Sequence, residues 1–221
     1  MGPEATIDLY RHIVNLTPAA RDQDHLRVLI YSNPKIPDRT LAIAGGGESP
    51  LAALIESARL LEAAGASVIA MPCNASHHYL EQLRNAVGIP ILDMITETCV
   101  TLRRRHPEVK TAGLLASNGS VRSQIYHRAL KAEGIAALLP CESDQSFIQS
   151  AIAEVKAGKH TEEIRKGLLA AGERLIQAGA QAVILGCTEI PLVFDSGAFP
   201  YHSLNSTLIL AEAAVNSAGS G

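Results

Sequence analysis

The chain has 221 residues, of which 47% are apolar and 19% are charged, so it can build a buried core and is not a disordered protein. Its formal net charge of -3 offers no basic surface to phosphates, which argues against a nucleic-acid partner. The four cysteines form no Cys-x-x-Cys pair, and there is no signal peptide and no apolar run of about 18 residues. We therefore expect a soluble protein of the reducing cytoplasm, with no disulfide framework and no membrane segment.

Short apolar runs bounded by turn residues alternate with helical patterns along the whole chain. Strands are expected at Arg27–Tyr31, Ser67–Met71, Ile89–Leu92, Thr111–Leu115, Ala136–Leu139, Ala182–Leu185 and Phe199–His202. Helices are expected at Ile7–Leu16, between Ser49-Pro50 and Gly65, and at Ser76–Val87, Ile95–Arg105, Ser120–Glu133, Asp144–Ala157, Thr161–Ala178 and Asn205–Asn216. This alternation predicts an α/β fold with parallel strands and right-handed crossovers.

An internal repeat relates the two halves of the chain. Residues 64–74 align with residues 178–188 at a constant spacing of 114 residues. Each copy runs from a helix end through a glycine and a buried strand to a cysteine, which predicts two related α/β lobes. The second half opens with the strand at Thr111–Leu115, whereas the first half opens directly with a helix. Either the opening strand of the first lobe lies upstream of Met1, or this lobe has lost it.

The two cysteines of the repeat, Cys73 and Cys187, are candidates for chemistry. Both follow predicted strands at their carboxyl ends, where α/β sheets bind ligands, and a helix near Ser76 would favour a thiolate at Cys73. No metal-ligand spacing and no redox Cys-x-x-Cys motif accompanies them. The third option is proton transfer at a carbon from two opposite faces. A thiol suits this task because its pKa of about 8.5 lies near working pH. For Cys99 and Cys141 we expect a packing role.

The cysteines lie in the segments Met71-Pro72-Cys73-Asn74-Ala75-Ser76-His77 and Leu185-Gly186-Cys187-Thr188-Glu189. These segments resemble the two cysteine signatures of the aspartate/glutamate racemase superfamily. The stretch from Tyr31 to Thr40 and the opening Met1-Gly2-Pro3-Glu4-Ala5-Thr6 resemble the aspartate racemase branch in particular. The resemblance implies two similar parallel-sheet α/β lobes related by pseudo-twofold symmetry, with the active site between them. We expect residues 1–93 plus 205–221 in one lobe and residues 94–204 in the other.

The resemblance also implies an activity, which is racemisation of an acidic amino acid, aspartate first, without pyridoxal phosphate, another cofactor or a metal. It implies that Cys73 and Cys187 are the two acid/base residues, one a thiolate that removes the α-proton and the other a thiol that reprotonates the opposite face. The substrate-binding residues that it implies are Arg39, Asn74, Ala75, Ser76, Ser117, Lys156, Thr188 and Glu189. Arg39 and Lys156 would each pair with a substrate carboxylate. Members of the family are commonly homodimers, so we expect one here.

Several positions depart from the family pattern. Glu189 stands where the glutamate racemase branch tends to carry His, Ala75 where Thr is usual, and Asn205 where Asp is usual. Two other functions stay open: a related isomerase or decarboxylase, which the presence of both cysteines disfavours, and an inactive or regulatory protein that binds acidic amino acids. His77 and His78 are expected at the surface or behind the site.

Overall fold

The computed structural model describes residues 1–194, 199 and 201–218, and it confirms the α/β class. Its sheet has four parallel strands in the order β2-β1-β3-β4. They are β1 (Thr111–Ala116), β2 (Ala136–Leu138), β3 (Ala182–Gly186) and β4 (Ser203–Asn205). The two central strands are buried along almost their whole length, as continuous apolar runs in a parallel sheet predict.

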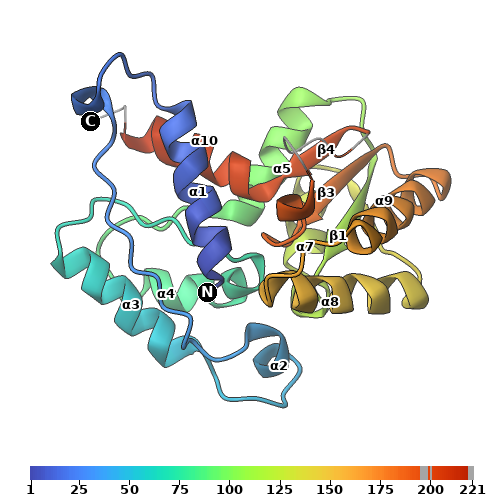
Figure 1. Cartoon of the computed structure of the whole chain (residues 1–221), viewed down its shortest axis with the longest axis horizontal. Helices are drawn as coiled ribbons and strands as arrows, with labels where there is room; N and C mark the ends of the chain where they lie inside the picture. Colours follow the sequence, from blue (N-terminus) through green and yellow to red (C-terminus); the bar gives the residue numbers. More distant parts are fainter. Residues whose placement is uncertain (195–198, 200, 219–221) are drawn as a thin grey trace.

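Helices cover both faces of this sheet (Figure 1). One face packs on α8 (Glu142–Lys156) and α9 (Glu162–Gln177), and the other on α5 (Met94–Arg105) and α7 (Ile125–Ala132). Strand side chains alternate between the layers: Leu185 faces α8 and α9, while Ile184 faces α5 and α7. Burial of each such side chain contributes about 1.5–3 kcal/mol, so the pattern of alternation determines the layering.

The first half of the chain is mostly helical. Its elements are α1 (Pro3–Leu16), η1 (Asp22–Asp24), α2 (Arg39–Ile43), α3 (Leu51–Ala63), η2 (Asn74–Tyr79) and α4 (Leu80–Arg84). Within residues 1–93 the only strand-type pairing is a parallel bridge between Ile69 and Ile91. The strands expected at Arg27–Tyr31, Ser67–Met71 and Ile89–Leu92 are therefore wrong as ladder strands. Their apolar pattern is real, but a ladder also needs a neighbour that supplies peptide groups along its length.

Other boundaries differ from the sequence expectations for local reasons. The strand expected at Phe199–His202 is wrong, because β4 begins at Ser203; Pro200 lies outside the described residues. The helix expected at Ser120–Glu133 is broken into α6 (Asn118–Arg122) and α7 by Gln124, which has a left-handed φ of 55°. The helix expected at Ser76–Val87 is divided into η2 and α4, and α1 begins at Pro3 rather than Ile7.

The last helix, α10 (Ser206–Ala218), connects the two halves. It packs against α1 and against α5, and the three lie side by side in Figure 1. Asn205 caps it, since its Oδ1 accepts hydrogen bonds from the backbone N–H groups of Thr207 (2.9 Å) and Leu208 (3.2 Å). The carboxylate of an Asp could accept the same two hydrogen bonds. Asn205, at a position where the family usually has Asp, therefore keeps the helix cap. A short turn, η3 (Pro191–Val193), lies between β3 and β4. None of the helices in the described part of the chain has both the length and the apolar character to cross a membrane.

Candidate functional site

A narrow cleft between the two halves collects the residues singled out from the sequence. From the first half it is lined by Gly2, Asp38, Arg39, Thr40, Pro72, Cys73, Asn74 and Ala75. From the second half it is lined by Ser117, Lys156, Cys187, Thr188 and Glu189. Its free volume is about 20 Å³, room for about one water molecule. Residues more than a hundred positions apart therefore converge on a single closed site.

Cys73 and Cys187 reach this cleft from different halves of the chain. Cys73 is the N-cap residue of η2 and follows the extended segment that contains the Ile69 bridge. Cys187 follows β3 directly and is buried, whereas Cys73 keeps an intermediate exposure. β3 brings Cys187 to the carboxyl edge of the sheet, which is where open α/β sheets bind ligands, and an extended segment with a single parallel bridge leads to Cys73.

Arg39 lies beside Cys73 at the start of α2. Asp38 caps this short helix by accepting a hydrogen bond from the Leu41 N–H (2.9 Å), and Arg39 Nη1 donates to the carbonyls of Ile36 (3.0 Å) and Pro37 (2.8 Å). Burial lowers the pKa of Arg39, but its interactions with Cys73, Asp38 and Glu189 together outweigh burial, and the net shift is upward. The guanidinium is thus a fixed cation next to one of the two sulfurs.

The other sulfur has the opposite surroundings. The Cys187 thiol donates to Oε2 of Glu189 over 3.0 Å, and the Thr188 hydroxyl donates to the same oxygen over 3.1 Å. Burial raises the pKa of Cys187 well above its usual value, and the negative charge of Glu189 adds to this effect. Cys187 is therefore held as a protonated thiol.

Lys156, the last residue of α8, brings a second cation to the cleft. Burial of its ammonium group lowers the pKa of Lys156, but the acidic side chains around it, among them Glu189, raise it and the net shift is upward. Arg39 and Lys156 come from different halves and line the same cleft. The site can accordingly neutralise two negative groups on one small molecule.

Asn74 has a structural task that the sequence did not reveal. Its Oδ1 accepts a hydrogen bond from the Tyr126 hydroxyl (2.5 Å), and its Nδ2 donates to Ser206 Oγ (3.2 Å). Ser206 in turn donates to the carbonyl of Leu185 (3.0 Å) at the end of β3. This chain of bonds connects the loops that carry Cys73 and Cys187, and it occupies the Asn74 amide.

His77 is buried behind the site and His78 is exposed, which are the two positions expected for this pair. The Met94 N–H donates to His77 Nε2 (3.1 Å), which places the ring proton on Nδ1, and Nδ1 donates to the Cys73 carbonyl (2.9 Å). Burial lowers the pKa of His77 and favours this neutral form. His77 thus fixes the Cys73 loop against the start of α5.

The remaining candidates are divided between the cleft and the core. Ala75, Ser117, Thr188 and Glu189 line the cleft. Ser76 is fully buried and does not line the cleft, and its role in substrate binding stays a prediction. Sequence reasoning missed the cleft residues Gly2, Asp38, Thr40 and Pro72, and it missed Tyr126 and Ser206 behind the site. Asp38 and Thr40 flank Arg39, and that adjacency is the one signal that could have found them.

The other two cysteines lie apart from the cleft. Cys99 is buried in α5, as its expected packing role requires, and burial raises its pKa. Cys141 is exposed at the N-cap of α8, so a buried packing role is wrong for it. All four cysteines are free.

Among the described residues, one group of side chains could hold a metal ion. His106, Glu108 and His202 offer ligand atoms that lie within 4.8 Å of one another. None of the three lines the cleft, so a metal bound there would not touch the two cysteines.

Comparison with known proteins identifies the fold and the family. Residues 1–214 match the family described as Asp/Glu/Hydantoin racemase. The chain is 28% identical to a Bacillus subtilis protein named broad specificity amino-acid racemase RacX, over 98% of this chain and 94% of that protein. It superimposes on an aspartate racemase from Picrophilus torridus with a TM-score of 0.87 at 30% identity, covering 99% of this chain and 90% of that one.

A more distant likeness concerns the fold alone. A glutamate racemase isoform, RacE1, from Bacillus anthracis gives a TM-score of 0.67 at 14% identity, over 96% of this chain and 77% of that one. The family match spans nearly the whole chain and includes every residue that lines the cleft. The chain belongs to the Asp/Glu/hydantoin racemase family.

Proposed function

We propose that the chain is a cofactor-independent amino-acid racemase that acts on aspartate, with Cys73 and Cys187 as the two acid/base residues. The observation that carries this proposal is the opposite environment of the two sulfurs in one cleft. The Arg39 cation lies beside Cys73, whereas burial and the negative charge of Glu189 raise the pKa of Cys187 and keep it protonated. A racemase of two bases needs this arrangement, because one group must accept a proton while the other donates one.

The proton balance of the step follows from these states. The Cys73 thiolate takes the proton from the substrate α-carbon, and the electron pair of the broken C–H bond moves into the adjacent carboxylate. The Cys187 S–H then gives its proton to the opposite face of the carbon. The product has inverted configuration, Cys73 is a thiol and Cys187 is a thiolate. The reverse reaction starts from this second state, so the same two groups serve both enantiomers.

The two cations of the cleft support a dicarboxylate substrate. Arg39 and Lys156 can each pair with one carboxylate, and the charge that develops on the α-carboxylate is stabilised by a cation already in position. The raised pKa of Lys156 keeps it an ammonium ion, whereas a lysine that forms a Schiff base must be a free amine. Lys156 thus suits carboxylate binding rather than attachment of a carbonyl cofactor. Similarity to an aspartate racemase at 30% identity favours aspartate over longer acids.

Substrate entry requires the cleft to open. A free volume of about 20 Å³ has no room for an amino acid, so the walls from the two halves must separate and close again. Closure over the substrate would exclude water and strengthen the charge interactions that stabilise the carbanion.

The test is α-proton exchange of L-aspartate in heavy water, followed by NMR, together with the appearance of D-aspartate. We expect exchange and inversion in the unmodified protein, and a loss of roughly a hundredfold or more in each of Cys73→Ser and Cys187→Ser. Cys141→Ser is the matched control, because this exposed cysteine lies outside the cleft, and it should keep the full rate.

The outcomes separate the alternatives. A folded sample that binds aspartate without exchange supports the binding-protein reading and contradicts racemisation. Release of carbon dioxide from the substrate supports the decarboxylase. Exchange of alanine as fast as aspartate would contradict a role for two cations and would favour broad specificity.

A further inference from the structure

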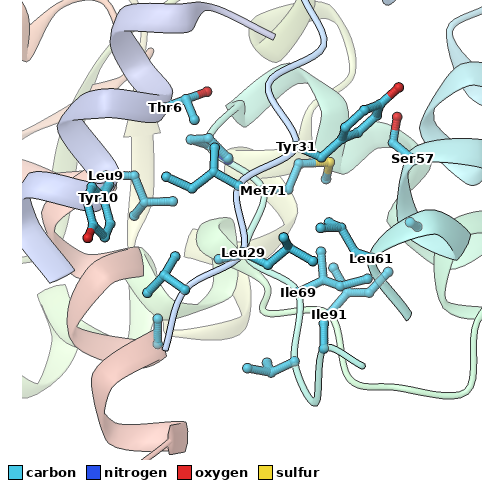
Figure 2. Close-up of a pocket in the computed structure, with 18 of the residues that line it drawn as sticks. Thr6, Leu9, Tyr10, Leu29, Tyr31, Ser57, Leu61, Ile69, Met71 and Ile91 are labelled. Atoms are coloured by element: carbon cyan, nitrogen blue, oxygen red, sulfur yellow. The ribbon is translucent and has the colours of Figure 1, made fainter. Parts of the chain in front are cut away.

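A cavity of about 540 Å³ lies within the first half of the chain, and its walls come from α1, α3 and the segments Leu26–Tyr31 and Ser67–Met71. Figure 2 shows the apolar side chains that project into it, among them Leu9, Leu29 and Ile69. Apolar walls offer packing but few directional contacts, so they select no particular ligand. A group of side chains able to bind a metal ion gathers elsewhere, at an edge of the sheet in the second half.

His106, Glu108 and His202 form this group, which we call the histidine cluster. His106 is the C-cap residue of α5, Glu108 lies between α5 and β1, and His202 directly precedes β4. The strands are parallel, so β1 and β4 begin at the same edge of the sheet. Cys187 follows the end of β3 and therefore lies at the opposite edge. The length of the sheet thus separates the cluster from the cleft.

The three side chains already lie close to the spacing that a metal ion requires. Their ligand atoms lie within 4.8 Å of one another, and His106 Nδ1 is 3.6 Å from Glu108 Oε1. Ligand atoms on a tetrahedral zinc ion, with bonds of about 2.0–2.2 Å, are about 3.3–3.6 Å apart. The ring centroids of His106 and His202 are 4.4 Å apart, with the ring planes tilted by 41°. Glu108 and His202 are exposed, so small rotations of their side chains can bring the ligand atoms onto one ion.

The backbone fixes the turn that carries two of the three residues. The His106 carbonyl accepts a hydrogen bond from the Val109 N–H (3.1 Å). Arg103 Nη1 donates to the Pro107 carbonyl within the same turn (2.7 Å). His106 and Glu108 are therefore held on a closed turn, and a metal ion would have to order only their side chains, which lowers the entropic cost of binding.

The third residue, His202, stands at the start of a short edge strand. β4 has three residues and pairs with β3 alone. The His202 carbonyl accepts from the Val183 N–H of β3 (2.8 Å), which extends this ladder by one bond. β4 then leads directly into α10, which Asn205 caps. A ligand on His202 would fix the start of the strand that leads to α10.

Two imidazoles and a carboxylate form a donor set typical of zinc. Zinc sites with three protein ligands commonly leave the fourth position to water, and the exposure of this cluster leaves room for one. Nitrogen donors favour zinc, cobalt, nickel and copper, whereas magnesium and calcium prefer oxygen. The cluster therefore suits a divalent transition metal.

We propose that His106, Glu108 and His202 bind one divalent transition-metal ion, with zinc as the expected ion, and that this ion links the turn between α5 and β1 to the start of β4. Its role is structural. The racemisation proposed above needs no metal, and the cluster and the cleft have no residue in common among those that the structure describes. The proposal therefore stands or fails independently of racemisation.

The experiment is a titration of the metal-free chain with zinc chloride, followed by calorimetry and by thermal unfolding. The variants are His106→Gln, His202→Gln and Glu108→Gln. His78→Gln is the matched control, because this exposed histidine lies outside the cluster. Magnesium chloride is the control for the choice of metal.

Zinc should bind the unmodified chain and His78→Gln with equal affinity. We expect the affinity to fall by roughly a hundredfold in each histidine variant of the cluster and by roughly tenfold in Glu108→Gln, because each change removes one ligand. At a zinc concentration of about a hundred times the dissociation constant, the thermal midpoint of the unmodified chain should rise by about 5–10 °C. His106→Gln and His202→Gln should not show this rise, and magnesium should not cause it.

Zinc also binds thiolates, and cobalt distinguishes the cluster from the cleft. A thiolate ligand gives a cobalt complex a strong charge-transfer band in the near ultraviolet, whereas the cluster has no sulfur and should give only the visible bands of nitrogen and oxygen ligands. Cys73→Ser should leave this spectrum and the affinity unchanged. A charge-transfer band that is present with the first equivalent of cobalt and disappears in Cys73→Ser would place the ion in the cleft and overturn the proposal.

Hydrogen exchange tests the link to β4. With zinc, the Val183 amide should exchange roughly tenfold more slowly, because its partner is the carbonyl of His202. In His202→Gln, zinc should not change this rate. If His106→Gln and His202→Gln bind zinc as tightly as the unmodified chain, the proposal is overturned. If zinc binds through these histidines but leaves the Val183 amide unchanged, the link between the turn and β4 is wrong.

Discussion

The two sulfurs of the cleft differ in their burial and in their charged neighbours. Glu189 Oε2 accepts a hydrogen bond from the Cys187 thiol, with 3.0 Å between oxygen and sulfur, and the charge of Arg39 interacts with Cys73. The residue types could be read from the sequence, since the repeat singles out both cysteines. The protonation states could not, because they depend on which charge folds against which sulfur. Glu189 lies two residues after Cys187, and this spacing alone does not predict that its carboxylate contacts the thiol.

Glu189→Gln tests this local arrangement. Removal of the negative charge should lower the pKa of Cys187, since that charge helps burial to raise it. The thiolate titration of Cys187, taken as the ultraviolet difference from the same variant with Cys187→Ser, should move to lower pH. Racemisation should fall by about tenfold, because a smaller fraction of Cys187 is then the protonated thiol that must donate the proton. Glu56→Gln, an exposed position in α3, is the control, and an unshifted titration in Glu189→Gln would contradict the assignment.

At the scale of elements, the position of Arg39 depends on the contact between α2 and α6. A Cβ on Gly119 of α6 would lie 2.9 Å from Thr40 Oγ1 and 3.0 Å from Thr40 Cα, so only glycine permits this approach. Thr40 follows Arg39 directly, and the contact therefore sets where the guanidinium lies. In the sequence, Gly119 is only a glycine near the start of a helix, and this predicts neither the contact between α6 and α2 nor the role of Thr40 in it.

Gly119→Ala should push α2 away and misplace Arg39 while the two cysteines stay in place. We expect kcat/KM for aspartate to fall by about tenfold, mostly through KM, because a charge-assisted contact to the substrate is weakened. Gly46→Ala is the control, since its Cβ would meet nothing closer than Leu41 O at 4.0 Å. Equal kcat/KM values in the two variants would count against the role of the contact.

The elements themselves were predictable where a pattern was local. The apolar runs of β1 and β3 and the stripes of α3, α8 and α9 identify these elements because each buries a regular face. Two kinds of feature were not predictable. The break at Gln124 comes from one left-handed residue, and α2 is too short to leave a periodic pattern. Pairing of Ser67–Met71 depends on a neighbour rather than on its own residues.

At the scale of the whole molecule, buried His77 couples folding to pH. The pKa of an unfolded histidine is about 6.5, and burial lowers the pKa of His77 in the folded protein. The unfolded chain therefore binds more protons in acid. The stabilisation is fully present above pH 6.5 and is lost as the pH falls from there toward the lowered folded value.

The free energy of unfolding, measured by urea titration, should decline as the pH drops below about 6.5, by up to about 1.4 kcal/mol per pH unit. In His77→Gln this acid slope should be smaller, while exposed His78→Gln should keep most of it. The same slope in unmodified protein and in His77→Gln would exclude His77 as its source.

The packing of α10 on α1 has a consequence for how the chain is made. Leu9 and Ile13 of α1 are buried in one cluster with Met94 of α5 and with Leu210, Ala211 and Ala214 of α10, so the packing of α1 is completed only after α10 has been synthesised. Until α10 emerges from the ribosome, part of that apolar stripe is open to water and to other nascent chains, while the sheet of the second half can already assemble. Nascent chains should for this reason rely on chaperones that bind α1, and a ribosome that stalls before α10 is complete should release aggregation-prone chains.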